Sequence, residues 1–396
     1  MRTLDDLRQK QGLPLEVKVL LTRERIRQWV NEYGEDGVYV SFSGGKDSTV
    51  LLDLVRNVCG YTSVPAVFVD VPTQYPELKE FVKTYSDVEI LKPKISFMEV
   101  CSKYGFPLIS KEVSETVSYA RKYLKKIADE GRNDKMNYAF GMADLLGIER
   151  RRGGSEDYNA LLRGEISDEI LKNAPVRLQI LFGKLEHKDH GVPTGEYSSM
   201  YDRRRYQFFL DAPFEIGSDC CKAMKKAPIH KYARETGRMP MTAQMADESL
   251  LRRQQWVKFG CNGFDRKNPL SNPMSFWTEQ DVLQYIAENN LPICSVYGKV
   301  IKDCGKGNCD GQLSWADYGL YEETGKPKYK CTGCKRTGCM LCGFGCHMEK
   351  SPNRFELLKK THPKMYALLD TVKNSGVTMR EAIEWTNAHS NLNIRL

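Results

Sequence analysis

The chain has 396 residues, a formal net charge of +8 and thirteen cysteines. It is long enough for two or three compact units, and it contains no run of eighteen apolar residues that could cross a bilayer. The first residues lack the apolar segment of a signal peptide, so we expect a soluble cytoplasmic protein without membrane contact. That compartment keeps thiols reduced, so cysteines crowded in this way indicate metal binding more than a disulfide scaffold.

Three apolar, β-branched segments are predicted to be strands, with helical patterns around them: strands over 38–42, 66–71 and 88–91, and helices over 14–34, 49–58 and near 96–104. Strands that alternate with helices form parallel, doubly wound sheets whose ligands bind at the carboxyl ends of the strands. The expected fold class is therefore α/β.

Changes in composition along the chain predict five regions. They are a nucleotide-binding half over 1–114, a helical, charged insertion over 115–214, the remainder of the α/β domain over 215–302, a Cys-rich metal-binding region over 303–350 and C-terminal helices over 351–396.

The stretch "SGGKDS" follows the first predicted strand and opens the next helix. Two glycines let backbone N–H groups converge, and the helix start and the Lys46 ammonium both favour an anion. The spacing is not that of a Walker A loop. It resembles the PP-loop of the ATP pyrophosphatase superfamily, which predicts an ATP site made by Ser43, Gly44, Gly45, Lys46, Asp47 and Ser48.

Asp70 is expected at the carboxyl end of the neighbouring strand. A carboxylate there, or that of Asp47, is a suitable ligand for Mg²⁺, which prefers oxygen donors.

Three further segments carry a more specific resemblance: "CCKAMKKAPIHKY" at 220–232, "NPMSFWTEQDVLQYIAENNLPI" at 272–293 and "CTGCKRTGCMLCGFGCH" at 331–347. In this order after the PP-loop, they resemble the phosphoadenylyl-sulfate and adenylyl-sulfate reductase family. The resemblance implies a 4Fe-4S cluster on Cys220, Cys221, Cys339 and Cys342. It also implies that Lys225 lies between cluster and substrate.

Two other groupings of the cysteines stay open. Four thiolates suit iron–sulfur or zinc, and a local set could bind a cluster alone: Cys334, Cys339, Cys342 and Cys346. A second, structural zinc could be bound by Cys304, Cys309, Cys331 and Cys334, which have ribbon-like spacing.

The chain departs from the family pattern at two places. The reductases attack sulfate with a cysteine in a C-terminal "ECGLH" tail, whereas the last cysteine here is Cys346. In "AQMADESLLR" (243–252), Ser249 and Arg252 match the family's anion-binding segment, but Met245 and Ala246 replace its arginines. A methionine cannot make the bidentate hydrogen bonds of an arginine.

The expected function is therefore ATP binding, adenylation of an acceptor with release of pyrophosphate, and sulfur transfer. Lys46, Asp47, Lys225 and Arg252 are the expected catalytic residues. The expected partner is a sulfur or electron donor of the cysteine desulfurase or thioredoxin type. A nucleic-acid acceptor could contact the arginine runs at 150–152 and 203–205.

Two alternatives remain. One is a sulfonucleotide reductase, an oxidoreductase whose nucleophile has moved to Cys346 or Cys261. The other is a non-catalytic module that senses nucleotides or binds nucleic acid.

Overall fold

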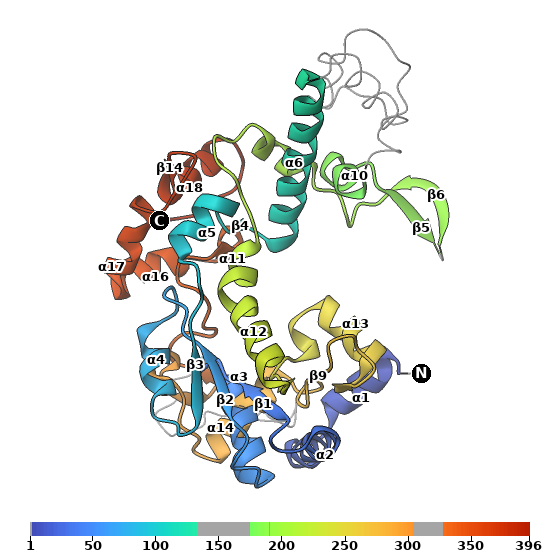
Figure 1. Ribbon diagram of the computed structural model, residues 1–396, viewed down its shortest axis with the longest axis vertical. Coiled ribbons are helices and arrows are strands. Elements are labelled where there is room, and N and C mark those ends of the chain that lie inside the picture. Colours follow the sequence, from blue (N-terminus) through green and yellow to red (C-terminus); the bar gives the residue numbers. More distant parts are fainter. Residues whose placement is uncertain (1, 134–174, 190, 304–327) are drawn as a thin grey trace, which may run out of the picture. The chain divides into compact units, whose positions relative to one another are not determined.

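The computed structural model describes residues 2–133, 175–189, 191–303 and 328–396 (Figure 1). The chain forms two compact units, each built from two stretches of sequence. The first, here called the sheet unit, comprises Met1–Lys94 and Met224–Cys339, and the second, the helical unit, comprises Ile95–Ala223 and Met340–Leu396.

The sheet unit contains the predicted alternation of strands and helices. Its elements are α1 (Leu4–Gly12), α2 (Leu15–Tyr33), β1 (Val38–Ser41), α3 (Lys46–Asp53, continued by a π-helical turn Leu54–Val58), β2 (Ala66–Val69), α4 (Pro76–Val82), β3 (Val88–Leu91), α12 (Ala227–Thr236), β7 (Met239–Met241), α13 (Leu250–Phe259), β8 (Asn262–Gly263), β9 (Leu270–Ser271), α14 (Glu279–Glu288), β10 (Val300–Lys302) and β11 (Tyr329–Cys331).

Six strands form the main sheet in the order β3-β2-β1-β7-β9-β8. All neighbours are parallel except β8 and β9, which are antiparallel. The chain moves outward from β1 to β3 in one direction and from β7 to β9 in the other, so the order reverses between β1 and β7. This confirms the predicted α/β class and marks the place where such sheets bind ligands.

Alternate residues of β1 explain why both faces of the sheet are covered. Val38 and Val40 pack into the large core formed with α2, α3 and α14, while Tyr39 packs with Val67 and Tyr232 of α12. Successive side chains of a strand point to opposite faces, so a continuous apolar run is what a strand buried on both sides requires.

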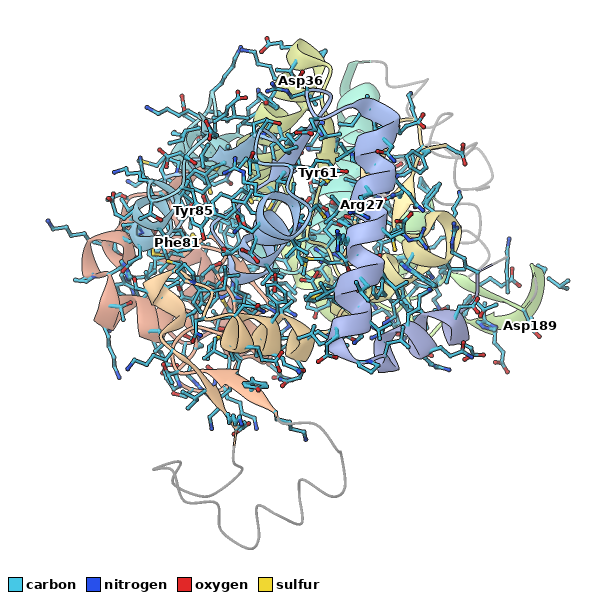
Figure 2. The ribbon with its side chains drawn as sticks, turned by 90° about the horizontal axis from the view of Figure 1, so that it is seen from below. Arg27, Asp36, Tyr61, Phe81, Tyr85 and Asp189 are labelled. Carbon is cyan, nitrogen blue, oxygen red and sulfur yellow. The ribbon has the colours of Figure 1, made fainter. Side chains whose placement is uncertain are left out.

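Two features fix helices of the sheet unit against its core. The Lys18 ammonium on α2 and the Asp281 carboxylate on α14 form an ion pair at 2.6 Å, with the Lys18 side chain 1% exposed. Near α4, Phe81 packs edge-on against Tyr85 with 5.3 Å between ring centroids (Figure 2). Tyr85 also contacts Phe42 in the same way, at 5.1 Å, immediately before the PP-loop.

The helical unit contains α5 (Phe97–Tyr104), β4 (Leu108–Ile109), α6 (Lys111–Asn133), α10 (Val176–Phe182), β5 (Glu186–Asp189), β6 (Val192–Tyr197), α11 (Asp219–Cys221), β12 (Gly343–Phe344), α16 (Arg354–Thr361), α17 (Pro363–Tyr366), β13 (Lys373–Asn374), β14 (Val377–Thr378) and α18 (Met379–Ala388).

Within the region 115–214, the described residues include α10 and part of α6, and also the antiparallel hairpin of β5 and β6. Gly191 at the turn has φ +88°, a conformation that favours glycine and interrupts a helix. Residues 134–174 and 304–327, which include Cys304, Cys309 and the arginines at 150–152, lie outside the described residues. Among the helices that are described, none is both long and apolar enough to span a bilayer.

Candidate nucleotide-binding site

The loop between β1 and α3 has the backbone that the PP-loop resemblance predicts. Gly44 has φ +71°, and a Cβ there would lie 3.0 Å from Cγ2 of Val82 and 3.3 Å from the carbonyl oxygen of Leu78. Both the left-handed conformation and the close approach of α4 therefore require glycine at position 44. Helix α3 begins at Lys46, directly after Gly45.

Hydroxyl groups hold this loop in shape. The Ser43 N–H donates to Oγ of Ser48 at 3.1 Å, and the Gly45 N–H points to Oγ of Ser43 at 3.3 Å. The Ser48 hydroxyl in turn donates to the carbonyl of Gly45 at 2.9 Å. Ser43 and Ser48, both predicted to bind the nucleotide, therefore hold the loop in shape through hydrogen bonds within it.

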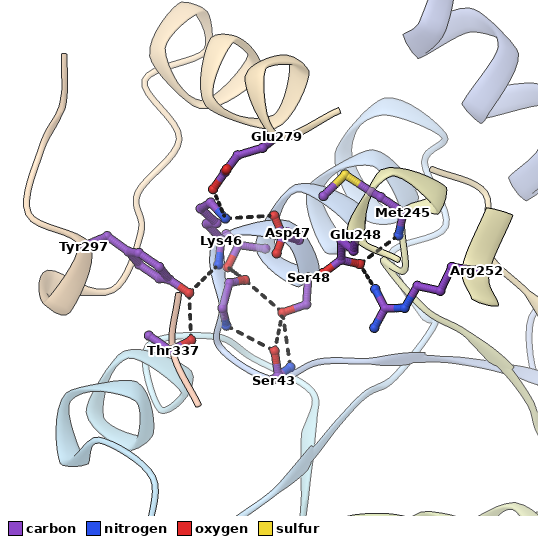
Figure 3. Close-up of polar contacts among 12 residues, drawn as sticks. Ser43, Lys46, Asp47, Ser48, Met245, Glu248, Arg252, Glu279, Tyr297 and Thr337 are labelled. Atoms are coloured by element: carbon purple, nitrogen blue, oxygen red, sulfur yellow. Dashed lines mark hydrogen bonds and ion pairs between the residues drawn. The ribbon is translucent and has the colours of Figure 1, made fainter. Parts of the chain in front are cut away.

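Lys46 is the central cation of the site although it is only 3% exposed. Its Nζ lies 3.3 Å from Oδ1 of Asp47 and 3.3 Å from Oε1 of Glu279 (Figure 3). Burial by itself lowers the pKa of Lys46, but the two carboxylates outweigh burial and the net pKa is raised. Lys46 is therefore a charged ammonium at neutral pH.

Tyr297 covers the amide end of the loop. The Lys46 N–H donates to the Tyr297 hydroxyl oxygen at 3.3 Å, and that hydroxyl is 2.7 Å from Oγ1 of Thr337 (Figure 3). Burial raises the pKa of Tyr297, so the phenol stays neutral. The phenol oxygen thus occupies a position where a bound phosphate oxygen would accept the same N–H.

These residues line a pocket of about 170 Å³ at the reversal point of the sheet. Its charged lining residues are Lys46 and Arg336, and Asp47, Asp247, Glu248 and Glu279. Glu248 pairs with Arg252 and Asp247 with Arg253, whereas Asp47 and Glu279 both lie beside Lys46. A polyphosphate would therefore meet two carboxylates next to the central cation, which a metal ion accompanying it could neutralise.

Arg252 and Ser249 lie at the start of α13, beside this pocket. The Ser249 hydroxyl oxygen accepts the Arg252 N–H at 3.3 Å, so Ser249 is the N-cap of the helix. The Arg252 guanidinium pairs with Glu248 (Figure 3). Burial lowers the pKa of Arg252 and neighbouring Arg336 lowers it further.

Met245 and Ala246 lie where the sequence places them, in the loop after β7. They are 3% and 1% exposed, and Met245 lines the pocket. Arg336, for which no sequence motif gave a signal, brings a guanidinium to the same pocket from the Cys-rich segment.

The other predicted magnesium ligand, Asp70, is engaged elsewhere. Its carboxylate accepts a hydrogen bond from Nζ of Lys79 at 2.5 Å, and it is not among the residues lining the pocket.

The predicted cluster ligands are distributed over both units. Cys220 and Cys221 lie on α11 and Cys342 precedes β12, all in the helical unit, whereas Cys339 is the last residue of the sheet unit. Lys225 lies in a π-helical turn, Lys222–Lys226. Within the described ranges, no group of three or more His, Cys, Asp or Glu side chains is arranged to hold a metal ion.

The remaining cysteines have different surroundings. Cys346 is fully buried, its thiol donates to the carbonyl of Cys342 at 3.5 Å, and burial raises its pKa to about 12. Cys334 lies in the sheet unit, with its sulfur 4.0 Å from the Tyr75 hydroxyl. Cys261 lines another pocket, and its sulfur accepts a hydrogen bond from Ser275 at 3.2 Å.

The arginine run at 203–205 is largely occupied by ion pairs. Arg203 pairs with Glu112 at 2.9 Å, and Arg204 pairs with Asp202 at 2.6 Å. Two of these three side chains are thus engaged within the chain, which weakens the case for this run as a nucleic-acid contact.

Comparison with known proteins adds family membership to this geometry. The family model described as the phosphoadenosine phosphosulfate reductase domain matches residues 37–129 and 165–343, more than half of the chain. No curated protein matches. A solved structure, the phosphoadenylyl-sulfate (PAPS) reductase from Candida auris in a phosphate complex, is similar at 15% identity over 69% of this chain and 82% of that chain, with a TM-score of 0.32.

Proposed function

Because the chain belongs to the phosphoadenosine phosphosulfate reductase domain family, an enzyme family of the PP-loop type, we propose that its sheet unit binds ATP with Mg²⁺ and adenylates an acceptor. The observation that carries the proposal is the acidic lining around Lys46. Asp47 and Glu279 both lie 3.3 Å from Nζ, and Asp247 and Glu248 line the same pocket.

The carboxylates of the pocket favour a triphosphate bound together with a metal ion. A sulfonucleotide without a metal ion fits them less well. Magnesium at nucleotide sites is held by one or two carboxylates together with phosphate oxygens. Such an ion therefore does not need three protein ligands, and the described residues contain no group of three arranged to hold a metal. Asp47 and Glu279 would hold the ion, which would neutralise phosphate charge when bound.

The residues of the loop have clear tasks in such a reaction. The acceptor oxygen forms a bond to the α-phosphorus, the bond from that phosphorus to the bridging oxygen breaks, and pyrophosphate leaves with the electron pair. Lys46 and the N–H groups of Gly45 and Lys46 stabilise the charge on this leaving group. A carboxylate of the pocket that is not assigned to the ion, that of Asp247, takes the acceptor's proton. A sulfur nucleophile then attacks the acceptor atom that bears the adenylated oxygen, the bond between that atom and the oxygen breaks, and AMP leaves with the oxygen and the electron pair.

ATP–pyrophosphate exchange tests the proposal, with candidate acceptors added in turn, RNA and DNA among them. Lys46→Ala should abolish exchange, whereas Lys83→Ala, which removes an exposed lysine paired with Glu80, should leave exchange unchanged. Melting temperatures check that both variants are folded. Exchange that survives in Lys46→Ala would contradict the proposal.

One observation favours a second candidate function, reduction of a sulfonucleotide. Arg336 and Arg252 place two guanidinium groups close to the pocket, so an oxyanion could be bound despite Met245 and Ala246. The candidate nucleophiles weaken this alternative. Cys346 is buried with a pKa of about 12, and Cys261 does not line the PP-loop pocket. Thioredoxin-dependent sulfite release without ATP–pyrophosphate exchange would establish it.

We also propose a 4Fe-4S cluster on Cys220, Cys221, Cys339 and Cys342. The donor chemistry fits, because thiolates are the usual ligands of such clusters. The described residues do not present an assembled group, so no reaction step is assigned to the cluster. Protein purified without oxygen should contain about four irons per chain. Cys339→Ser should lower that number and Cys59→Ser should not, whereas zinc alone in the purified protein would refute the cluster.

A further inference from the structure

A second pocket lies in the sheet unit and has no lining residue in common with the PP-loop pocket. It measures about 430 Å³ and lies between α1, α2, the end of α13 and the turn that leads into β8. Pockets for small molecules typically have volumes of about 300–1,000 Å³. The second pocket is therefore large enough for an organic ligand.

The charged side chains that line this pocket are mostly cationic: Arg2, Lys10, Arg25 and Lys258 against Asp6 and Asp265. Asp6 is already engaged, since its carboxylate accepts the N–H of Thr3 at 2.7 Å and caps α1. Within the described part of the chain, no ion pair involves Arg2, Lys10 or Lys258. The pocket therefore favours an anion.

Gly260 provides the room for one of these cations. It has φ +71°, and a Cβ at this position would lie 2.8 Å from Cζ of Arg2. Any other side chain would displace the guanidinium, so the glycine allows Arg2 to lie against the pocket wall. The turn thus leaves room for this exposed cation at the pocket.

Aromatic groups form the other part of the wall. Phe259 and Phe264 line the pocket, and the guanidinium of Arg266 stacks on the Phe259 ring at 4.9 Å. Trp256 lies between this pocket and a small neighbouring cavity and is 3% exposed, and its indole N–H has no hydrogen-bond partner among the described residues. Buried donors without partners are rare, because leaving one unsatisfied costs free energy. An acceptor on a bound ligand would satisfy it.

We propose that this pocket binds an anionic aromatic small molecule, separately from the nucleotide at the PP-loop. The ring of the ligand packs against Phe264, which is 37% exposed, and contacts Phe259 beside the cations of Arg266 and Lys258. Its anionic group is bound by Arg2 and Arg25. The Trp256 N–H donates to an acceptor of the ligand.

The class of ligand can be tested with a matched pair of dyes. The probe is 8-anilinonaphthalene-1-sulfonate, and its neutral counterpart is N-phenyl-1-naphthylamine, which has the rings without the sulfonate. Fluorescence titration uses the full-length Lys46→Ala protein, which removes the central cation of the PP-loop pocket, and the lining variants described below are made in this same background, so that any dye bound at the PP-loop is common to all of them. We expect one saturable site for the sulfonate dye, and binding of the neutral dye weaker by about tenfold or more.

Variants of the lining residues locate the site. Arg2→Gln and Arg25→Gln should each lower the affinity for the sulfonate dye by about tenfold. Arg8→Gln is the matched control, since Arg8 is on α1 but does not line the pocket and pairs with Asp5. Phe259→Leu keeps apolar volume and removes the ring, and should also weaken binding. Melting temperatures show which variants are folded.

Three results would overturn the proposal. They are the absence of a saturable site for the sulfonate dye, equal affinity for the neutral dye, and a loss in Arg8→Gln as large as in Arg25→Gln. None of them depends on ATP or on adenylation, so the outcome is separate from that of the proposed function.

Discussion

Removal of the Tyr297 hydroxyl should strengthen nucleotide binding and lower the free energy of unfolding of the ligand-free protein. In Tyr297→Phe, the Lys46 N–H loses its acceptor at 3.3 Å and Thr337 loses its partner at 2.7 Å. A hydrogen bond of this kind contributes about 0.5–1.5 kcal/mol, and the long bond to the amide belongs at the lower end. A phosphate must break this bond in the native protein but not in the variant.

The expected gain in ATP affinity is therefore about two- to fivefold, accompanied by a loss of about 1 kcal/mol in the free energy of unfolding. Isothermal titration measures the first and urea unfolding the second. Thr337→Val is the control, because it removes only the 2.7 Å partner and leaves the phenol oxygen on the Lys46 amide. It should lower stability without raising affinity. Weaker ATP binding in Tyr297→Phe would refute the reasoning and show that the phenol itself contacts the nucleotide.

Three further outcomes are expected. Asp281→Ala removes the carboxylate that lies 2.6 Å from Nζ of the buried Lys18 and should cost about 3–5 kcal/mol in urea unfolding. Adding Lys18→Met should recover part of this loss, and no recovery would contradict the ion-pair reasoning. Gly44→Ala forces a Cβ to 3.0 Å from Val82 at φ +71° and should abolish ATP binding in a protein that still melts cooperatively, as circular dichroism and titration can show. In metal-free protein, burial raises the pKa of Cys346 to about 12, so its thiol stays protonated until the pH approaches that value. Iodoacetamide at pH 8 should therefore leave Cys346 unlabelled, as mass spectrometry can show. Rapid labelling would refute its burial.

The PP-loop could be read from the sequence because its chemistry is local. Gly44 and Lys46 act through a turn and a helix start that six consecutive residues determine. The residues that complete the site could not be read in this way. Tyr297 is 251 positions from Lys46, and it reaches the loop only because the chain after α14 returns to the carboxyl end of β1.

Arg336 shows that a pocket can contain a cation that comparison with a family motif does not predict. Met245 lines the PP-loop pocket at the position where the family arginine is absent. A guanidinium nevertheless reaches the same pocket from a segment whose cysteines drew attention to metal binding. The grouping of those cysteines stays a prediction, since no periodicity specifies which distant thiols meet.

The connectivity of the sheet unit has a consequence for synthesis of the chain. Val38 of β1 pairs with Met239 of β7, so one side of the central strand has no neighbour until about 200 further residues have left the ribosome. Contacts between such distant positions slow folding, because a long loop must close before they contribute. At synthesis rates of about 5–20 residues per second, the edge of β1 stays open for roughly 10–40 seconds. An unpaired strand edge of this kind can pair with other chains, so the half-made protein is the form most in need of a chaperone.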